Sequence, residues 1–430
     1  MLSHVMPFLG HHCNRHFPRS CCPELWLLLN MFDLQFTTIL LLVSATAPLA
    51  VTGRPHAPRQ EDLCKEVSFS LPVTSQNLVF SSPPPPDNGT AVANFIRDGW
   101  AGSPTSGTVT IKSTFTIRGT YCIPPSHIPA QDTLEILLHG ITYNKTMWTG
   151  YGFASNRDPS SPLGTNYYNW HHHANTRGYA TLAIDRLGHG ANPDRPDPLS
   201  VVQPQIQVDL LQALLTSVRS SSCPAVNPLH TIYGKVVLVG HSWGSYLSVG
   251  LAKQFPTSPL VDALVLTGFS TTINASVLTA SEFVPAALQD PERFPGHAYG
   301  YATMARAAKR LTYYGGEYDP AIPAFDFAYK DTVTAGEAGA FVAVLDGGSA
   351  VGFSKPVLVV TGAEDKVLCK FRDVTCAEIL NKSRKWFPDV KGDAYEYLSV
   401  AETGHDLTLH YSAPETFEQV HDWLDKTLAT

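Results

Sequence analysis

A serine between two glycines, in the segment Gly240–Gly244 (GHSWG), is the first candidate for chemistry in this sequence. It directly follows the apolar, β-branched run Lys235–Val239 and precedes a stretch of small residues with the pattern of a helix. At such a strand-to-helix junction the backbone reverses sharply, and a side chain two positions before or after the serine would collide with the turn. The pattern predicts that Ser242 is held in a strained, exposed turn, as a nucleophile requires.

A serine hydroxyl becomes a good nucleophile only when an imidazole takes its proton, and the imidazole needs a carboxylate to hold its tautomer and stabilise its charge. For a serine at this kind of junction, the acid is expected after a later strand and the histidine last in the chain. Asp365 follows the apolar run Lys355–Thr361, and His405 follows the run Ala394–Val400. We therefore predict Asp365 as the acid and His405 as the base.

Three neighbouring residues compete for these roles. Glu364 and Glu402 are rival acids, and His410 is the rival base. We prefer Asp365 and His405, and we expect His410 to face a helix or solvent.

The tetrahedral intermediate of acyl chemistry needs two hydrogen-bond donors for its negatively charged oxygen. One is expected from the backbone N–H of Trp243, directly after the serine. The other is expected from the loop after Leu134–Leu138, where Gly140 allows close backbone approach and Ile141 offers its N–H.

Together these motifs resemble the α/β-hydrolase superfamily over about residues 132 to 427. The resemblance implies that Ser242, Asp365 and His405 occupy the family's nucleophile, acid and base positions, with Ile141 and Trp243 as its oxyanion donors. Dehalogenases and epoxide hydrolases of the superfamily place an aspartate at the nucleophile position, so a serine favours ester or related acyl chemistry. The motifs that carry the resemblance are His139-Gly140, Gly240–Gly244, Gly362–Asp365 and Gly404–Asp406.

The sequence thus predicts a serine hydrolase that cleaves carboxylic esters through an acyl-enzyme, with no metal or organic cofactor. The expected partner is a small-molecule ester with an apolar or aromatic part. Two alternatives stay open. The same residues could perform acyl transfer or hydrolyse a lactone, or the protein could be a non-catalytic ligand binder that kept the fold.

The elements that must position these residues follow from hydrophobic periodicity. Period-two alternation from Val67 to Phe80 and from Thr108 to Cys122 predicts two antiparallel strands, joined by an extended loop at Pro83–Pro86. Short, continuous apolar runs separated by helical stretches then predict a mostly parallel, doubly wound α/β sheet whose strands are buried on both faces. The runs are Leu134–Leu138, Tyr179–Ile184, Val236–Val239, Val261–Leu266, Val357–Val360 and Tyr395–Val400, and the clearest helices are Gln205–Arg219 and Pro414–Lys426.

One interval, from about Thr271 to Gly352, breaks this alternation and is rich in aromatic residues and alanine. It is interpreted as a lid insertion over the strand ends, whose aromatic side chains either line an apolar pocket or form the lid's own core. The predicted organisation is a leader (1–50), N-terminal strands and loops (51–130), the first part of the core (131–270), the lid (271–354) and the second part of the core (355–430).

Composition points to an extracellular protein without a nucleic-acid partner. The chain has a net charge of -7, which argues against binding to nucleic acids or anionic membranes, because such partners require clustered Lys and Arg. The apolar run Thr37–Val51 is shorter than the roughly 20 residues that cross a bilayer and reads as a signal peptide, so no membrane anchor is expected after its removal. Two interpretations stay open. Translation starts at Met31, or it starts at Met1 and Arg15 and Arg19 supply the positive charge of a long n-region.

Secretion is also favoured by four glycosylation sequons, at Asn88, Asn144, Asn274 and Asn381. We predict a disulfide between Cys369 and Cys376 and a second between Cys64 and Cys122, which leaves Cys223 free or buried.

Two further polar motifs are read as structural. The run His171–His173 is interpreted as surface histidines rather than a metal site, because successive helical residues point in different directions. Asp185 is interpreted as a structural residue.

Overall fold

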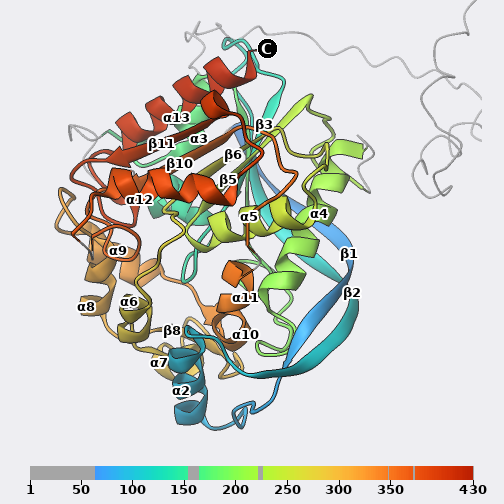
Figure 1. Ribbon diagram of the computed structural model, residues 1–430, viewed down its shortest axis with the longest axis vertical. Coiled ribbons are helices and arrows are strands. Elements are labelled where there is room, and N and C mark those ends of the chain that lie inside the picture. The colour runs from blue at the N-terminus through green and yellow to red at the C-terminus, as the bar shows by residue number, and fades with distance from the viewer. Residues whose placement is uncertain (1–62, 154–163, 221–225, 347, 371–372, 430) are drawn as a thin grey trace, which may run out of the picture.

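A mostly parallel sheet of eight strands forms the centre of the molecule (Figure 1). The computed structural model describes residues 63–153, 164–220, 226–346, 348–370 and 373–429. The predicted leader, the run Thr37–Val51 and Cys223 lie outside the described residues. The strand order is β1-β2-β4-β3-β5-β6-β10-β11. The strands are β1 Cys64–Phe80, β2 Thr105–Cys122, β3 Thr133–Leu138, β4 Ala180–Ile184, β5 Lys235–His241, β6 Ala263–Thr267, β10 Val357–Gly362 and β11 Tyr395–Val400.

Strands β4, β3, β5, β6, β10 and β11 of this sheet all run parallel, and β1 and β2 add an antiparallel hairpin at one edge. This is the α/β-hydrolase architecture with N-terminal antiparallel strands that the sequence predicts. Strands β3, β4, β6 and β10 are buried along their whole length, and β5 is buried from Val236 on, as their continuous apolar runs require. The expectation is wrong for β11, which is half-exposed because it is the last strand and has no neighbour on its outer side.

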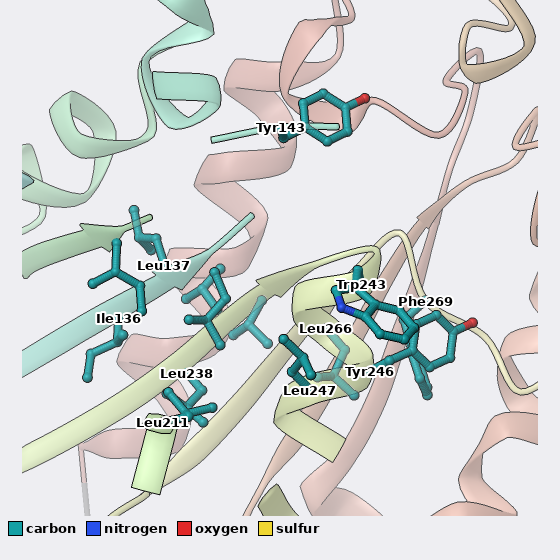
Figure 2. Packing of buried hydrophobic residues seen from close by; sticks show 14 of the residues in the cluster. Ile136, Leu137, Tyr143, Leu211, Leu238, Trp243, Tyr246, Leu247, Leu266 and Phe269 are labelled. Atoms are coloured by element: carbon teal, nitrogen blue, oxygen red, sulfur yellow. The ribbon is translucent and has the colours of Figure 1, made fainter. Parts of the chain in front are cut away.

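Helices cover both faces of the sheet (Figure 1). On one face α4 packs against α5, and on the other α3 packs against α13. Leu211 of α4, Leu247 of α5 and Leu238 of β5 meet in the core between them (Figure 2). The helices are α3 Trp170–Thr176, α4 Pro204–Ser220, α5 Trp243–Gln254, α12 Cys376–Ser383 and α13 Ala413–Leu428, with short 3-10 turns at Lys145–Gly152, Arg384–Trp386, Gly392–Ala394 and Leu407–Leu409.

Residues 268–356, between β6 and β10, form a separate layer that we call the cap. It carries a small antiparallel sheet of three strands in the order β7-β8-β9. Its elements are α6 Ala275–Ala280, β7 Phe283–Pro285, α7 Ala286–Gln289, β8 Tyr301–Met304, α8 Ala307–Arg310, a 3-10 turn at Leu311–Tyr313, α9 Ile322–Tyr329, β9 Val333–Thr334, α10 Ala335–Gly339 and α11 Phe341–Asp346.

The connection between β1 and β2 is more than the extended loop expected from its prolines. It contains helix α2 (Gly89–Gly99), which begins at Asn88, whose side chain accepts a hydrogen bond from the N–H of Ala91. Helix α2 packs against α10 and β7, so the N-terminal segment contacts the cap.

In the part of the chain that the structure describes, the disulfides Cys64–Cys122 and Cys369–Cys376 are present, as predicted. The first joins paired residues of the β1–β2 hairpin, and the second closes a short loop beyond β10. Among the residues that the structure describes, no helix combines the length and apolarity that crossing a membrane would take.

Candidate active site

Ser242 lies at the sharp turn between β5 and α5, in a backbone conformation that is rare for serine (φ 51°, ψ -115°). The two flanking glycines are required by close packing. A Cβ on Gly240 would lie 2.4 Å from the backbone nitrogen of Ser245, and one on Gly244 would lie 2.1 Å from the carbonyl oxygen of Leu138. The sequence motif therefore has a local physical cause: the turn exists only where both positions lack a side chain.

Ser242, His405 and Asp365 form one hydrogen-bonded chain. Ser242 Oγ lies 2.8 Å from Nε2 of His405, and Nδ1 of His405 lies 2.7 Å from Oδ2 of Asp365. Asp365 comes from the loop after β10 and His405 from the loop after β11. Because these strands and β5 are parallel, their carboxyl ends meet at one edge of the sheet.

The surroundings of His405 set its protonation. Asp365 is fully buried, and its other oxygen accepts hydrogen bonds from the backbone N–H groups of Val367 and Leu368. Burial by itself lowers the pKa of His405, but the adjacent Asp365 carboxylate outweighs it and raises that pKa above its ordinary value. The carboxylate also holds the proton on Nδ1, so that Nε2 is left to accept the serine proton.

The rival residues lie elsewhere. The carboxylate of Glu364 binds Lys370 Nζ at 2.9 Å, and Glu402 is exposed. His410 is fully buried, which excludes the expected solvent-facing position, and its ring packs against those of Tyr314 and Tyr318. Its Nε2 accepts a hydrogen bond from the N–H of Gly404, so it supports the loop that carries His405.

The two predicted oxyanion donors flank the serine. A Cβ on Gly140 would lie 3.0 Å from Cβ of Ser242, which shows how closely this loop approaches the nucleophile. Within the described residues, neither the N–H of Ile141 nor that of Trp243 donates to another protein group. Both are therefore available to a substrate oxygen.

A narrow cavity of about 450 Å³, its open mouth included, lies over Ser242 and His405. Its walls are largely apolar and aromatic. On one wall the ring of Phe341 stacks on that of Trp243, with centroids 5.5 Å apart, and meets Trp100 edge-on at 5.3 Å. The other lining residues are Ile141, Tyr143, Tyr246, Ile273, Leu278, Tyr313, Val367 and Leu368.

The cavity is lined by the core and its loops, by the cap and by the segment after α2. Phe341, Tyr313, Ile273 and Leu278 come from the cap, and Trp100 follows helix α2. The cap's other aromatic residues mostly pack within the core, as Tyr314 does against Tyr318. Sequence reasoning missed Trp100, because no motif or periodicity connects its segment with the serine.

A second group of buried charges lies behind the site and was also missed. Arg310 and Asp326, both from the cap and fully buried, form an ion pair. Arg310 also donates to Oγ1 of Thr142 at 2.7 Å, and its guanidinium lies 4.2 Å from the ring centre of Tyr143, whose hydroxyl donates to Asp406. Burial, with Asp326 nearby, raises the pKa of Asp406 to about 7. These contacts join the cap to the loops that carry Ile141 and His405.

The prediction that His171–His173 lie at the surface is partly wrong. His171 is buried, with Nδ1 2.6 Å from Oγ1 of Thr181, because α3 packs against β4. His172 and His173 are partly exposed. Within the described part of the chain, no three His, Cys, Asp or Glu side chains are arranged to hold a metal ion.

Asp185 has a structural role, as interpreted. It is buried and accepts hydrogen bonds from the backbone N–H groups of Lys145 and Ala191, each at 2.8 Å. Burial raises the pKa of its carboxyl to about 6.

The four sequon asparagines all lie in the described residues. Asn88 and Asn381 are exposed. Asn144 and Asn274 are half-buried, and their side-chain amides donate to Oδ2 of Asp331 and to the carbonyl of Lys366.

Comparison with known proteins shows the family of this chain. Residues 136–420 match a family model described as the alpha/beta hydrolase family. Similar solved structures include a monoglyceride lipase from Saccharomyces cerevisiae (14% identity, 73% of this chain and 92% of that chain, TM-score 0.48). Others are a putative aryl esterase from Burkholderia cenocepacia (14%, 73% and 96%, 0.45) and epoxide hydrolase I of potato, Solanum tuberosum (15%, 72% and 96%, 0.44). No curated protein matches the chain.

Proposed function

The chain belongs to the alpha/beta hydrolase family, and from this premise we propose that it is a serine hydrolase that cleaves carboxylic esters. One observation carries the proposal: Ser242, His405 and Asp365 are linked by hydrogen bonds of 2.8 and 2.7 Å, and Ser242 and His405 line a cavity. A serine whose proton can pass to a carboxylate-supported imidazole is the arrangement that acyl transfer needs.

The reaction follows from these contacts. His405 Nε2 takes the proton of Ser242 as Oγ attacks the ester carbonyl carbon, and the N–H groups of Ile141 and Trp243 bind the oxygen that becomes negative. His405 then gives its proton to the departing alkoxide, which leaves as the alcohol. A water that gives its proton to His405 attacks the acyl-enzyme, and Ser242 regains its proton as the carboxylic acid leaves.

The cavity supports an ester with an apolar or aromatic part. The stacked rings of Trp243 and Phe341 and the edge of Trp100 offer a flat apolar wall, which favours aromatic or aliphatic groups over charged ones. The large polar or charged headgroup of a substrate would have no partner on that wall.

Covalent labelling tests the proposal. A fluorophosphonate probe should label the native protein and not Ser242→Ala. The same variant should no longer hydrolyse acetyl, octanoyl or benzoyl esters that the native protein hydrolyses. Ser248→Ala is the matched control, because Ser248 is a buried serine of the same helix whose hydroxyl donates to the carbonyl of Gly244. Equal labelling of Ser242→Ala would refute the role of Ser242 as the nucleophile.

A second experiment separates hydrolysis from acyl transfer. The products formed in the presence of competing alcohols show whether water or an alcohol accepts the acyl group.

We also propose that the protein is secreted and glycosylated. Disulfides persist in oxidising compartments, and two are present in the described residues. N-terminal sequencing of protein from the medium should show the loss of the predicted leader, about residues 1–50. Treatment with a glycosidase should lower its mass, with the exposed Asn88 and Asn381 the first sites to test. Protein that stays inside the cell with an intact N-terminus would contradict this proposal.

A further inference from the structure

A buried arginine lies behind the loop that carries one of the oxyanion donors. Arg186 follows β4 and is almost fully buried. Its Nε donates to the carbonyl of His139 at 3.0 Å, and its Nη2 donates to the carbonyl of Gly140 at 3.1 Å. One guanidinium therefore holds two successive carbonyls of this loop.

The ring of His139 adds a third contact to this loop, the second to the carbonyl of Gly140. Its Nε2 accepts the backbone N–H of Arg186 at 3.0 Å, so the ring proton is on Nδ1, which donates to the carbonyl of Gly140 at 2.8 Å. Burial, together with the positive charge of Arg186, holds the pKa of His139 well below its usual range. The ring therefore stays neutral and in this tautomer.

The carbonyl of Gly140 and the N–H of Ile141 belong to one peptide group. In a trans peptide these two groups point in opposite directions. Because the carbonyl is held on the side of Arg186, the N–H is directed to the opposite side. A charge-assisted hydrogen bond to the carbonyl also polarises the peptide and makes its N–H a stronger donor.

The arginine is itself anchored from the cap. Its Nη1 forms an ion pair with Glu337 of α10, and both side chains are buried. Glu337 also accepts hydrogen bonds from Nε2 of His189 at 3.2 Å and from the N–H of Thr334 at 2.9 Å. Burial by itself raises the pKa of Glu337, but the charge of Arg186 and then His189 hold that pKa well below its usual range, so the pair is ionic.

We propose that Arg186 is a positioning residue of the oxyanion hole, which orients and polarises the peptide between Gly140 and Ile141 while Glu337 holds it in place from the cap. The inference rests on the proposed serine hydrolase function. It assigns to the cap a part in transition-state stabilisation besides lining the cavity.

The test compares oxygen esters with thionoesters, whose sulfur accepts hydrogen bonds weakly, so that the rate ratio between them reports on the oxyanion hole. In Arg186→Met, kcat for oxygen esters should fall about 10- to 100-fold with KM within about twofold, because loss of one whole donor costs about 100- to 1,000-fold. The ratio of oxygen-ester to thionoester rates should fall by a similar factor.

Two more variants separate positioning from folding. Arg186→Met leaves Glu337 buried without its cation, so the double variant Arg186→Met, Glu337→Gln removes both charges together. Arg186→Lys keeps the charge but cannot reach two carbonyls and a carboxylate at once. Either variant, once folded, should show the lowered rate ratio. A folded variant of either kind with native kcat and native ratio would overturn the inference.

A matched control arginine lies at the opposite end of the sheet. Arg219 also binds two successive carbonyls, those of Tyr233 and Gly234, and one carboxylate, that of Asp262. Arg219→Met should lower the unfolding temperature and leave the rate ratio unchanged.

The failure of this inference can be told apart from the failure of the proposed function. Absence of fluorophosphonate labelling at Ser242 in the native protein would refute the proposed function. Normal labelling with an unchanged rate ratio in the Arg186 variants would refute only this inference.

Discussion

Two buried histidine–carboxylate pairs lie in different regions of this molecule and differ in what surrounds them. His405 and Asp365 meet at the carboxyl ends of the parallel strands, with Nδ1 and Oδ2 2.7 Å apart. His421 of α13 and Glu135 of β3 meet inside the layer between helix and sheet, with Nε2 and Oε1 2.9 Å apart. In both, burial by itself lowers the histidine pKa and the carboxylate outweighs it, so that both pKa values are raised.

The pairs differ at the second ring nitrogen. Nδ1 of His421 lies 2.6 Å from the carbonyl of Phe417, and the other oxygen of Glu135 accepts the indole N–H of Trp170 at 2.7 Å. His421 therefore donates from both nitrogens, to a carbonyl and a carboxylate, and is a structural cation. His405 donates from one nitrogen only, and the other faces the hydroxyl of Ser242 beside the cavity. A histidine–carboxylate pair therefore acts as a base only where the second ring nitrogen is free to accept a proton, as Nε2 of His405 is.

The largest expected effect comes from the two histidines. His405→Ala should lower kcat for esters by about 10⁴- to 10⁶-fold, because the serine loses its proton acceptor. His421→Ala, assayed where it is folded, should keep kcat within about threefold. Steady-state kinetics on both variants checks this. A comparable loss of kcat in the two variants would erase the distinction between the pairs.

The carboxylates should show the next largest contrast. Asp365→Asn keeps the shape of the side chain but no longer holds the proton on Nδ1 of His405, so kcat should fall about 10³- to 10⁴-fold. Glu135→Gln is the matched control and should leave kcat nearly unchanged. An Asp365→Asn variant with more than a tenth of the native kcat would contradict the assigned role of the acid.

Stability should reverse the order of the two pairs. Glu135→Ala leaves His421 buried without its counter-charge and Trp170 without its acceptor, so the free energy of unfolding should fall by about 3–5 kcal/mol. Urea unfolding with the disulfides intact measures it. Activity per folded molecule should be retained. A Glu135→Ala protein as stable as the native one would show that this pair contributes nothing to the fold.

The smallest effect concerns pH. His405 acts as a base only in its neutral form, and the Asp365 carboxylate raises its pKa above the ordinary value of about 6.5. The acid limb of kcat/KM should therefore have its midpoint above that value, with activity lost as the pH falls through it. In Asp365→Asn the midpoint of the residual activity should move to lower pH. A midpoint that stays in place would mean that the carboxylate does not set the titration.

The features of the fold and of the site that depend on neighbouring residues could be predicted from the sequence. The turn at Ser242 is specified by Gly240 and Gly244, whose missing side chains make room for the backbone of Ser245 and Leu138. The buried strands are specified by apolar runs. The disulfide Cys369–Cys376 was predictable from the short loop that it closes, and Cys64–Cys122 from its place beside the predicted N-terminal strands. The exception among the strands, β11, follows from its place at the sheet edge, which its composition does not encode.

The supporting polar contacts were not predictable in the same way. Arg186 and Glu337 are 151 positions apart, and neither belongs to a periodic apolar pattern that would have marked it as buried. His171 and His410 were misjudged for a related reason. A histidine reads as polar in the sequence, although a partner such as Thr181 or the N–H of Gly404 allows it to be buried.

By itself the sequence determined the strand and helix periods and the glycine-flanked serine, because each depends on residues close together in the chain. The order in which acid and base follow the serine came from the chain order expected for a serine at such a strand-to-helix junction. The tertiary structure alone decided that Asp365 and His405 reach Ser242, that Trp100 and Phe341 wall the cavity, and that Arg186 lies behind Gly140. Those contacts join residues far apart in the chain, and burial and hydrogen bonding select them only once the sheet and cap have packed.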